Sequence, residues 1–369
     1  MTTFSITARD GKARTGVLHT PHGEVRTPAF MPVGTHATVK ALHPDEVRAS
    51  GADILLCNAY HLALRPGVDA IETAGGLHRF MGWDGSILTD SGGYQLVSLR
   101  EVAKVDDDGA EFISPYDGTR LRVTPEDAID IQRRLGADIV MTLDHPVPWG
   151  TADEEVRAAM ERTHAWAARC RAVHPGDGRL LFGIAQGGFD LQLRQESARQ
   201  IAALHFDGNA VGGLSVGEPL PVMEEMTAAS IAQLPESAPR YFMGLGTDHE
   251  LLAMVALGID MFDCVVPTRL ARNGTALTQQ GHLSLRNSVH HDDPDPIDAT
   301  CPCPACARFS RAYLRHLFKS GEILAHRLVS QHNLTHLGRL MGQARDAIAA
   351  GRFASMREQL TGTLAPCSG

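Results

Sequence analysis

The chain has 369 residues, 43% of them hydrophobic, and a formal net charge of −9 at pH 7. This length can bury a large core, and as one domain it suits a large α/β barrel. No run of eighteen apolar residues occurs, which argues against a membrane-spanning helix, and the first residues lack a secretory signal pattern. The net negative charge by itself argues against a nucleic-acid partner.

The first predicted elements are short antiparallel strands over residues 3–27, with Asp10-Gly11 as a turn. Short apolar runs then recur along the chain and predict further strands. They lie at about residues 27–33, 53–58, 86–89, 138–143, 180–185, 209–214, 240–245 and 259–266.

Helical stretches separate these runs. Thr124-Pro125-Glu126-Asp127 has the pattern of a helix start, and Gly136 is expected to end that helix. Further helices are predicted from Thr151 to about Val173 and from Asp248 to Leu257. Eight strands that alternate with helices favour a (β/α)8 barrel over an open doubly wound sheet. The sequence contains neither a glycine-rich dinucleotide fingerprint nor a P-loop.

Polar residues and glycines gather where the predicted strands end, which is the face of a barrel that carries chemistry. These ends hold Asp90 to Gln95, Asp144-His145, Gln186-Gly187-Gly188, Gly212-Gly213-Leu214, Met243-Gly244 and Asp263. A single Asp at a strand end is often only the N-cap of the next helix. Three Asp, one Gln and repeated Gly instead indicate a flat pocket, because glycine lets the backbone approach a planar ligand that Asp and Gln can hydrogen-bond.

Asp263 lies inside an apolar run that is expected to end at Pro267, where a carboxylate is costly unless it is paired or chemically used. Thr268, Arg269 and Arg272 follow, and these residue types hold phosphate oxygens. The pattern leaves two interpretations open. Asp263 is either a reactive carboxylate beside a phosphate-binding turn or a buried structural Asp followed by a solvated turn.

The cysteines predict a metal site. Seven is an odd number for a disulfide framework, and Cys301, Cys303 and Cys306 lie within six residues, which favours structural zinc in a reducing cytoplasm. His332, expected at the start of a helix from Asn333 to Ala350, is the favoured fourth ligand. The competing histidines are His290, His291, His326 and His336, whereas Cys57, Cys170 and Cys264 are expected to be ordinary buried thiols.

The region from 301 to 345 is basic although the chain is acidic. It carries Arg308, Arg311, Arg315, Lys319, Arg327, Arg339 and Arg345 against the single acid Glu322. Such a region can be the electrostatic footprint of an anionic partner.

Taken together, these motifs resemble the bacterial tRNA-guanine transglycosylases (queuine tRNA-ribosyltransferases) over nearly the whole chain. The resemblance is carried by residues 90–95, Gly183 to Gly187, Gly212 to Glu218, Asp263 to Arg269, and Cys301, Cys303 and Cys306 with His332. It implies a (β/α)8 TIM barrel with an N-terminal antiparallel β segment and an inserted zinc-binding subdomain. The implied divisions are 1–274 for the β segment and barrel, 275–340 for the subdomain, and 341–369 for a C-terminal helix packed on the barrel.

The resemblance also implies a reaction and its residues. The reaction would exchange the wobble guanine of GUN anticodons for a 7-deazaguanine in queuosine biosynthesis, through a covalent Asp–ribosyl intermediate. Asp263 would be the nucleophile and Asp90 the general acid/base. Asp144, Gln186 and Gly213 would hold the base edge, Tyr94 and Met243 its faces, and Leu214, Val216, Glu218 and Gly244 would complete the pocket. Thr268, Arg269 and Arg272 would contact RNA, and Cys301, Cys303, Cys306 and His332 would bind one structural zinc ion.

The implied partners are the tRNAs for aspartate, asparagine, histidine and tyrosine, a 7-deazaguanine base, and a second copy of the chain, in the cytoplasm and away from membranes. One position departs from the family pattern. Bacterial members usually follow the strand-four Asp with Glu-Cys, whereas here His145-Pro146 follows Asp144. Recognition of the guanine ring is unaffected, but the choice of incoming base is open. Because Val216 narrows the pocket, we expect 7-aminomethyl-7-deazaguanine to be favoured over queuine.

Two further functions remain to be weighed. A non-catalytic tRNA-binding partner subunit should lack the nucleophile, whereas Asp263 and Asp90 are present. A zinc-dependent barrel hydrolase should place its ligands at strand ends, whereas these cysteines lie outside the predicted strands.

Overall fold

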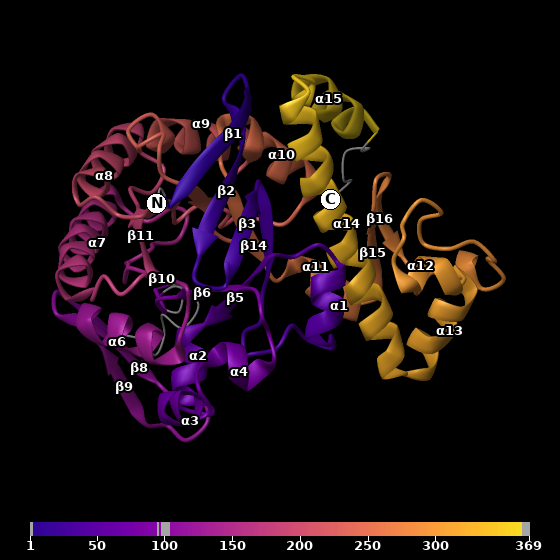
Figure 1. Cartoon of the computed structure of the whole chain (residues 1–369), viewed down its shortest axis with the longest axis horizontal. Coiled ribbons are helices and arrows are strands. Elements are labelled where there is room, and N and C mark those ends of the chain that lie inside the picture. The colour runs from indigo at the N-terminus through magenta and orange to yellow at the C-terminus, as the bar shows by residue number, and fades with distance from the viewer. Residues whose placement is uncertain (1–2, 94–95, 97–103, 364–369) are drawn as a thin grey trace.

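The computed structural model describes residues 3–93, 96 and 104–363. Its centre is a sheet of eight parallel strands in the order β4-β14-β13-β12-β11-β10-β6-β5 (Figure 1). Their bounds are β4 Ala29–Pro32, β5 Ile54–Asn58, β6 Ser86–Asp90, β10 Ile139–Met141, β11 Leu180–Ala185, β12 Gly208–Val211, β13 Arg240–Phe242 and β14 Met261–Cys264. A parallel bridge between Val33 and Leu56 joins the two edge strands and closes the barrel. The predicted (β/α)8 fold is confirmed.

Helices follow the strands and cover the barrel. They are α1 Pro44–Ala49, α2 Ala59–Leu64, α3 Val68–Thr73, α4 Leu77–Met81, α6 Pro125–Leu135, α7 Asp153–Val173, α8 Leu191–Ala203, α9 Leu220–Ile231 and α10 Asp248–Leu257. The predicted start of α6 is confirmed, because Thr124 and Asp127 cap each other's backbone N–H groups. The helix predicted from Thr151 begins two residues later, at Asp153.

A three-stranded antiparallel sheet covers the N-terminal end of the barrel. It consists of β1 Phe4–Asp10, β2 Ala13–Thr20 and β3 Gly23–Thr27. Its buried Phe4, Leu18 and Val25 belong to the same apolar cluster as the barrel strands. The turn after β2 also reaches the first residues of the barrel strands, where the Thr20 and Ser86 hydroxyls lie 2.8 Å apart. This end is therefore filled by packing, which leaves the opposite end for a ligand.

A second antiparallel sheet, which the sequence analysis missed, lies between β6 and α6. It consists of β7 Lys104–Asp106, β8 Gly109–Ile113 and β9 Arg120–Val123. Asp106 makes the first turn by accepting hydrogen bonds from the N–H groups of Asp108 and Gly109.

The remaining elements form a lobe beside the barrel and the helices that attach it (Figure 1). They are α11 Val266–Arg272, β15 Thr275–Thr278, β16 Gly281–Ser284, η1 Ser288–His290, α12 Pro304–Arg308, α13 Arg311–Ser320, α14 Ile323–Ala349 and α15 Phe353–Thr363. The helix predicted from Asn333 begins ten residues earlier, so His332 lies in the middle of α14 and not at its start. The apolar positions Leu328 and Val329 carry the helix through this region.

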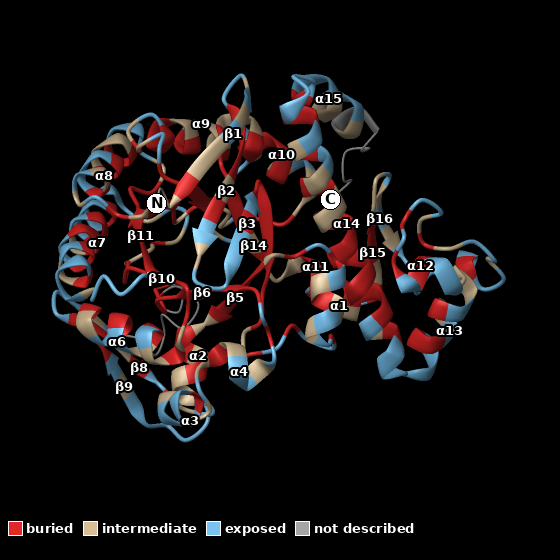
Figure 2. Cartoon of the chain, in the orientation of Figure 1, coloured by how far each residue is buried: buried red, intermediate tan, exposed pale blue. Residues whose placement is uncertain are grey.

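Burial is concentrated in the barrel and along α14 (Figure 2). The expected division at residue 340 falls within α14, so one continuous helix runs from the lobe onto the barrel. Across the part of the chain that the structure describes, no helix combines the length and apolarity needed to cross a bilayer.

Candidate active site and metal centre

Three buried or half-buried carboxylates gather where the barrel strands end. Asp90 is the last residue of β6, Asp144 follows β10, and Asp263 lies in β14. Burial is the main cause that raises the pKa of Asp90 and of Asp144, and the charges of Asp263 and Asp90, respectively, add to it. Burial and neighbouring like charges both favour the protonated form of a carboxyl group, and such shifts are typical of catalytic carboxylates.

Asp263 is held by one of its two oxygens. Its Oδ1 accepts hydrogen bonds from the Tyr241 hydroxyl at 2.5 Å and from the Gly244 N–H at 2.9 Å. No described residue donates to Oδ2. Burial raises the pKa of Asp263, while the bonds from Tyr241 and Gly244 oppose that shift. One oxygen is therefore anchored and the other is available to react.

Asp90 is held by the neighbouring strand end. Its Oδ2 accepts from the Asn58 amide at 2.5 Å and its Oδ1 from the Ala59 N–H at 2.8 Å. Burial raises the pKa of Asp90 to about 6, although these two bonds work in the opposite direction. A carboxyl group with a pKa near neutrality can both give and take a proton.

Asp144 and Gln186 form a rigid hydrogen-bonding edge. The Gln186 amide Nε2 donates to Asp144 Oδ2 at 2.7 Å, and both side chains are buried. Burial raises the pKa of Asp144 to about 7. Gly93 lies against this edge so closely that a Cβ there would stand 1.8 Å from Asp144 Oδ1. Glycine is therefore required at this position, as the strand-end pattern indicated.

The glycines after β12 lie equally close to Gln186. A Cβ on Gly212 would come within 2.7 Å of its Nε2, and one on Gly213 within 2.3 Å of its Oε1. Gly213 also has a φ of +67°, which glycine adopts without strain. The backbone of this loop and the amide of Gln186 thus form one continuous polar surface.

The loop continues through a residue with left-handed backbone, Ser215, whose φ is +59°. The Glu218 carboxylate holds this conformation by accepting from the Ser215 N–H at 2.5 Å and the Val216 N–H at 2.9 Å. The Ser215 hydroxyl donates to the Gly244 carbonyl. Leu214 is buried and Met243 half-buried at this end of the barrel, whereas Tyr94 lies outside the described residues.

His145, which follows Asp144, is neutral in this arrangement. Burial and the nearby Arg162 lower its pKa to about 4. Arg162 Nη1 lies 3.1 Å from His145 Nδ1, so this guanidinium donates and Nδ1 accepts. His145 therefore brings no charge to the space beside Asp144.

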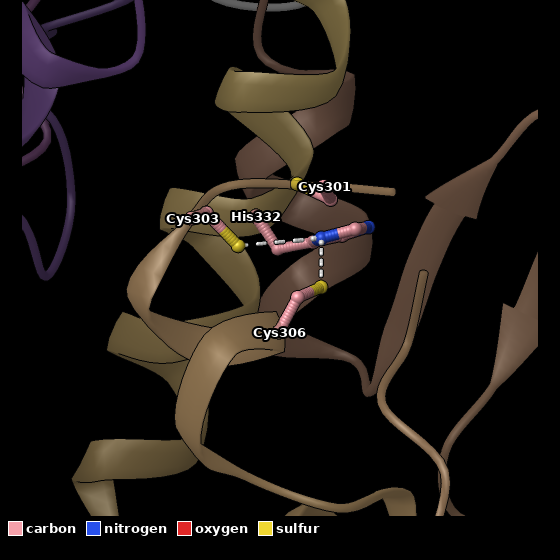
Figure 3. A group of neighbouring side chains, drawn as sticks. All are labelled: Cys301, Cys303, Cys306 and His332. Carbon is pink, nitrogen blue, oxygen red and sulfur yellow. Dashed lines mark hydrogen bonds between the residues drawn. The ribbon is translucent and has the colours of Figure 1, made fainter. Parts of the chain in front are cut away.

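The predicted metal ligands come together in the lobe. Cys301, Cys303, Cys306 and His332 each offer one ligand atom, and all four atoms lie within 4.8 Å of one another. Figure 3 shows Cys303 and Cys306 directed at the His332 ring, whose Nδ1 is 3.6 Å and 3.2 Å from their sulfur atoms. Three thiolates and one imidazole at these distances fit a closed tetrahedral zinc site, which is the structural kind.

The surroundings of His332 fix which nitrogen can bind metal. Its Nε2 lies 2.8 Å from the Leu277 carbonyl oxygen and so donates to it, which leaves Nδ1 as the ligand atom. The adjacent Asn333 accepts from the Leu277 N–H and donates to the carbonyls of Pro267 and Thr275. This pair ties the metal site to the segment that follows Asp263.

The predicted RNA-contact residues lie directly after the β14 strand. Thr268 is buried and its hydroxyl donates to the Val265 carbonyl, while Arg272 Nη1 donates to the Thr268 carbonyl. No described side chain pairs with Arg269. In the basic region, several cations have internal partners: Arg311 with Asp293, Arg327 with Glu46 and Arg339 with Asp298.

Sequence reasoning missed the residues that hold the carboxylates. Asn58 and Tyr241 contact Asp90 and Asp263 from neighbouring strands, and Arg194 contacts the loop carbonyls behind Gln186. The position of Asn58 at a predicted strand end was a usable signal. Tyr241 and Arg194 gave none, because each lies within an ordinary strand or helix pattern.

Comparison with known proteins agrees with this geometry. A family model described as queuine tRNA-ribosyltransferase matches residues 10–365. The chain is 51% identical over 356 residues to a queuine tRNA-ribosyltransferase of Herpetosiphon aurantiacus, covering 96% of this chain and 91% of the relative. It is 50% identical over 360 residues to one of Solidesulfovibrio magneticus, covering 97% and 96%. A protein of the same description in Sphingopyxis alaskensis is 51% identical over 359 residues, covering 96% of both chains.

Proposed function

Because the chain belongs to the queuine tRNA-ribosyltransferase family, an enzyme family that exchanges a guanine of tRNA in queuosine biosynthesis, we propose that Asp263 is the nucleophile of this exchange. The observation that carries the proposal is the pair of hydrogen bonds on Asp263 Oδ1. They orient the carboxylate through Oδ1, while no described residue donates a hydrogen bond to Oδ2. Asp90, whose pKa is about 6, lies near enough for their charges to interact.

The reaction then proceeds by two displacements. Asp263 Oδ2 bonds to C1′ of the ribose as the bond from C1′ to the guanine nitrogen breaks, and Asp90 gives the leaving guanine a proton. The incoming base loses a proton to the same carboxylate and attacks C1′, which releases Asp263. Two inversions retain the configuration, as in retaining glycosidases. The nucleotide must leave its stack to reach this pocket.

Base recognition is assigned to the polar surface beside Asp90. Asp144, Gln186 and Gly213 face one ligand edge, with Leu214, Val216, Glu218 and Gly244 around them and Met243 and Tyr94 proposed for the two ring faces. A carboxylate and an amide, fixed to each other at 2.7 Å, present acceptors and donors side by side. A planar purine edge is complementary to such a surface.

The test is the incorporation of labelled guanine into tRNA. The wild type should incorporate label without ATP. Asp263→Asn should lower the rate by about 1,000-fold or more while tRNA binding survives, because the shape is kept and the nucleophile is lost. Glu225→Gln, on the exposed side of α9, is the control for removal of one charge. A covalent tRNA adduct that forms equally well in Asp263→Asn would exclude the assignment, and failure of the wild type would favour a non-catalytic tRNA-binding role.

We infer that the incoming base is 7-aminomethyl-7-deazaguanine, with queuine as the alternative. Two features support the smaller base. Val216, which we assign to the pocket, would narrow the space for a 7-substituent. Glu218 holds the backbone of Ser215 and Val216 in place. Neutral His145 supplies no anion for the aminomethyl cation, so backbone carbonyls around Leu214 would have to accept from it. Both bases should be competed against guanine-labelled tRNA, and displacement by queuine at the lower concentration would overturn this choice.

We further infer that the tRNA substrates carry GUN anticodons, that the enzyme acts in the cytoplasm, where those tRNAs are, and that it works as a homodimer. Support for the homodimer comes from exposed apolar side chains on the lobe, among them Val289 and Ile323, which a second copy of the chain would cover. Sedimentation at micromolar concentration should give about twice the chain mass. A species of single-chain mass that retains full activity would exclude the dimer as the working form.

A further inference from the structure

Behind the base-recognition surface lies a buried cation that the exchange reaction does not itself use. Arg194, on α8, has no exposed surface. Its Nε donates to the Gly188 carbonyl and its Nη1 to the Gly212 carbonyl, each at 2.7 Å. Nη2 has no acceptor among the described residues and would lie 3.7 Å from a Cβ on Gly213.

Burying Arg194 in this way has a high desolvation free energy. A buried guanidinium without a contacting carboxylate loses its hydration and gains only partial compensation from carbonyl groups. No described acidic side chain lies within ion-pair distance of Arg194. Burial lowers its pKa to about 9, against the favourable charge of Glu218, so it stays protonated at neutral pH. Neutral side chains could brace two carbonyls at lower cost, which points to a more specific task.

The task follows from the geometry of one peptide. The Gly212 carbonyl and the Gly213 N–H belong to the same planar trans group, so they point in opposite directions. Because Arg194 draws the carbonyl toward α8, the Gly213 N–H must face away from α8. The Gln186 amide is close to this peptide, since a Cβ on Gly212 or Gly213 would come within 3.0 Å of it, and it donates to Asp144. No described residue accepts from this N–H, which is therefore free for a ligand.

The same helix face holds the neighbouring recognition residue. Ser197, three residues beyond Arg194, accepts from the Gln186 N–H at 2.9 Å. Glu218 secures the far side of the loop through the Ser215 and Val216 N–H groups. The loop from 212 to 218 is thus held by a buried cation at one end and a buried anion at the other.

We propose that Arg194 is a positioning residue for base recognition, acting through the orientation of the Gly212–Gly213 peptide. This inference rests on the proposed function, because it assigns the Gly213 N–H to an acceptor on the exchanged base. Arg194 itself touches neither base nor ribose. Replacing Arg194 should therefore weaken binding of the free base more than binding of the tRNA.

The experiment measures KM for labelled guanine and KM for tRNA separately, together with thermal unfolding. Arg194→Met removes the charge and the guanidinium N–H donors. Arg194→Lys keeps the charge but cannot donate to both carbonyls. Arg199→Met, on the exposed side of α8, is the matched control. We expect KM for guanine to rise at least about tenfold in both Arg194 variants. KM for tRNA should change by less than about twofold, and Arg199→Met should resemble the wild type.

The outcomes separate the alternatives. Equal changes in both KM values, or lower stability with an unchanged KM for guanine, would show that Arg194 only braces the fold and would overturn the proposal. If Arg194→Met does not fold, Arg194→Lys decides the question by the same comparison of the change in KM for guanine with the change in KM for tRNA. If the wild type and Arg199→Met also fail to incorporate guanine, the proposed function itself is wrong.

Discussion

At the scale of single residues, the candidate site is defined by how each carboxylate is held. Asp263 accepts from Tyr241 and Gly244, Asp90 from Asn58 and Ala59, and Asp144 from Gln186. Burial raises the pKa of all three. Their different partners suit them to the roles that we propose: nucleophile for Asp263, proton carrier for Asp90 and base anchor for Asp144.

The hydroxyl of Tyr241 should matter for the ionisation of Asp263. Its hydrogen bond opposes the rise in pKa that burial causes. Tyr241→Phe should therefore raise the pKa of Asp263 further, move the acid limb of the kcat profile to higher pH, and lower kcat near neutrality by about tenfold. Single-turnover rates across pH 5 to 9 measure this shift. A uniform fall at every pH would instead indicate a purely geometric role for Tyr241.

The Asp144 carboxyl group, which we assign to base recognition, should lower the stability of the free protein when it ionises. Its pKa is raised to about 7 from an ordinary value of 3.8, so its contribution to stability is fully present below pH 3.8 and is lost as pH rises through about 7. Asp144→Asn, which cannot ionise, should therefore stabilise the free protein at pH 8 by roughly 1–4 kcal/mol, and by less than about half as much at pH 5, where only part of the shift between the two pKa values has been crossed. Thermal unfolding at the two pH values checks this.

The same variant should lose base exchange. An equal change in stability at both pH values would show that Asp144 does not titrate in this range.

At the scale of elements, the site depends on the segments that follow the last barrel strand, β14, and on the helix α14 that contacts them. α14 carries His332 and Asn333, and these side chains bond β15 and the start of α11. The metal site thus joins the lobe to the segment after Asp263. Its expected role is to order this region, because structural zinc contributes folding free energy directly.

Cys303→Ser should release zinc and destabilise the region from 301 to 332. Hydroxyl oxygen is a poor substitute for thiolate in this site. We expect less than about 0.2 zinc per chain and faster amide exchange in α12 to α14, while the barrel strands stay protected. Metal analysis and hydrogen exchange measure both effects.

Cys170→Ala is the control, since this thiol is buried away from the cluster and should keep one zinc per chain. A full zinc complement with unchanged melting in Cys303→Ser would show that the ligands are wrongly assigned. Loss of activity alone, with folding intact, would indicate catalytic metal.

At the scale of the whole molecule, the two ends of the barrel have different tasks. β1 to β3 fill the N-terminal end with apolar side chains, and the turn after β2 places His22 on Asp138. The C-terminal end carries the carboxylates, and the lobe lies beside the barrel (Figure 1). The basic excess between 301 and 345 is smaller in effect than its sequence suggests, because Arg311, Arg327 and Arg339 have acidic partners.

Arg269 is the better candidate for a phosphate contact. Arg272 is partly committed to the Thr268 carbonyl, whereas no described side chain pairs with Arg269. Arg269→Glu should weaken tRNA binding about tenfold or more at low salt and reduce the slope of log K against log salt by about one, since one phosphate contact is lost. Binding measured between 50 and 300 mM salt gives this slope.

Arg199→Glu reverses a charge on the exposed face of α8 and controls for net charge. If both variants reduce the slope equally, the effect is long-range and Arg269 is not a contact. Arg272→Glu should add a loss of thermal stability, which distinguishes an internal brace from an RNA contact.

The sequence by itself determined the architecture and the metal cluster. Eight apolar runs alternating with helices specify a parallel barrel, because each strand must bury both faces. Cys301, Cys303 and Cys306 were recognisable because their spacing is local. Asp90, Asp144 and Gln186 were recognisable because polar side chains at strand ends break an otherwise apolar pattern.

Tertiary structure alone decided how those side chains are held. Tyr241 and Arg194 look like ordinary strand and helix residues, yet each contacts a segment from another part of the chain, Tyr241 with Asp263 and Arg194 with Gly212. The sheet of β7 to β9 and the early start of α14 at Ile323 have a different origin, because their signals, the turn at Asp106 and the apolar positions Leu328 and Val329, are local, although the sequence analysis missed them. Hydrogen bonds between distant segments form only once the barrel brings those segments together, so no local pattern of residues can report them.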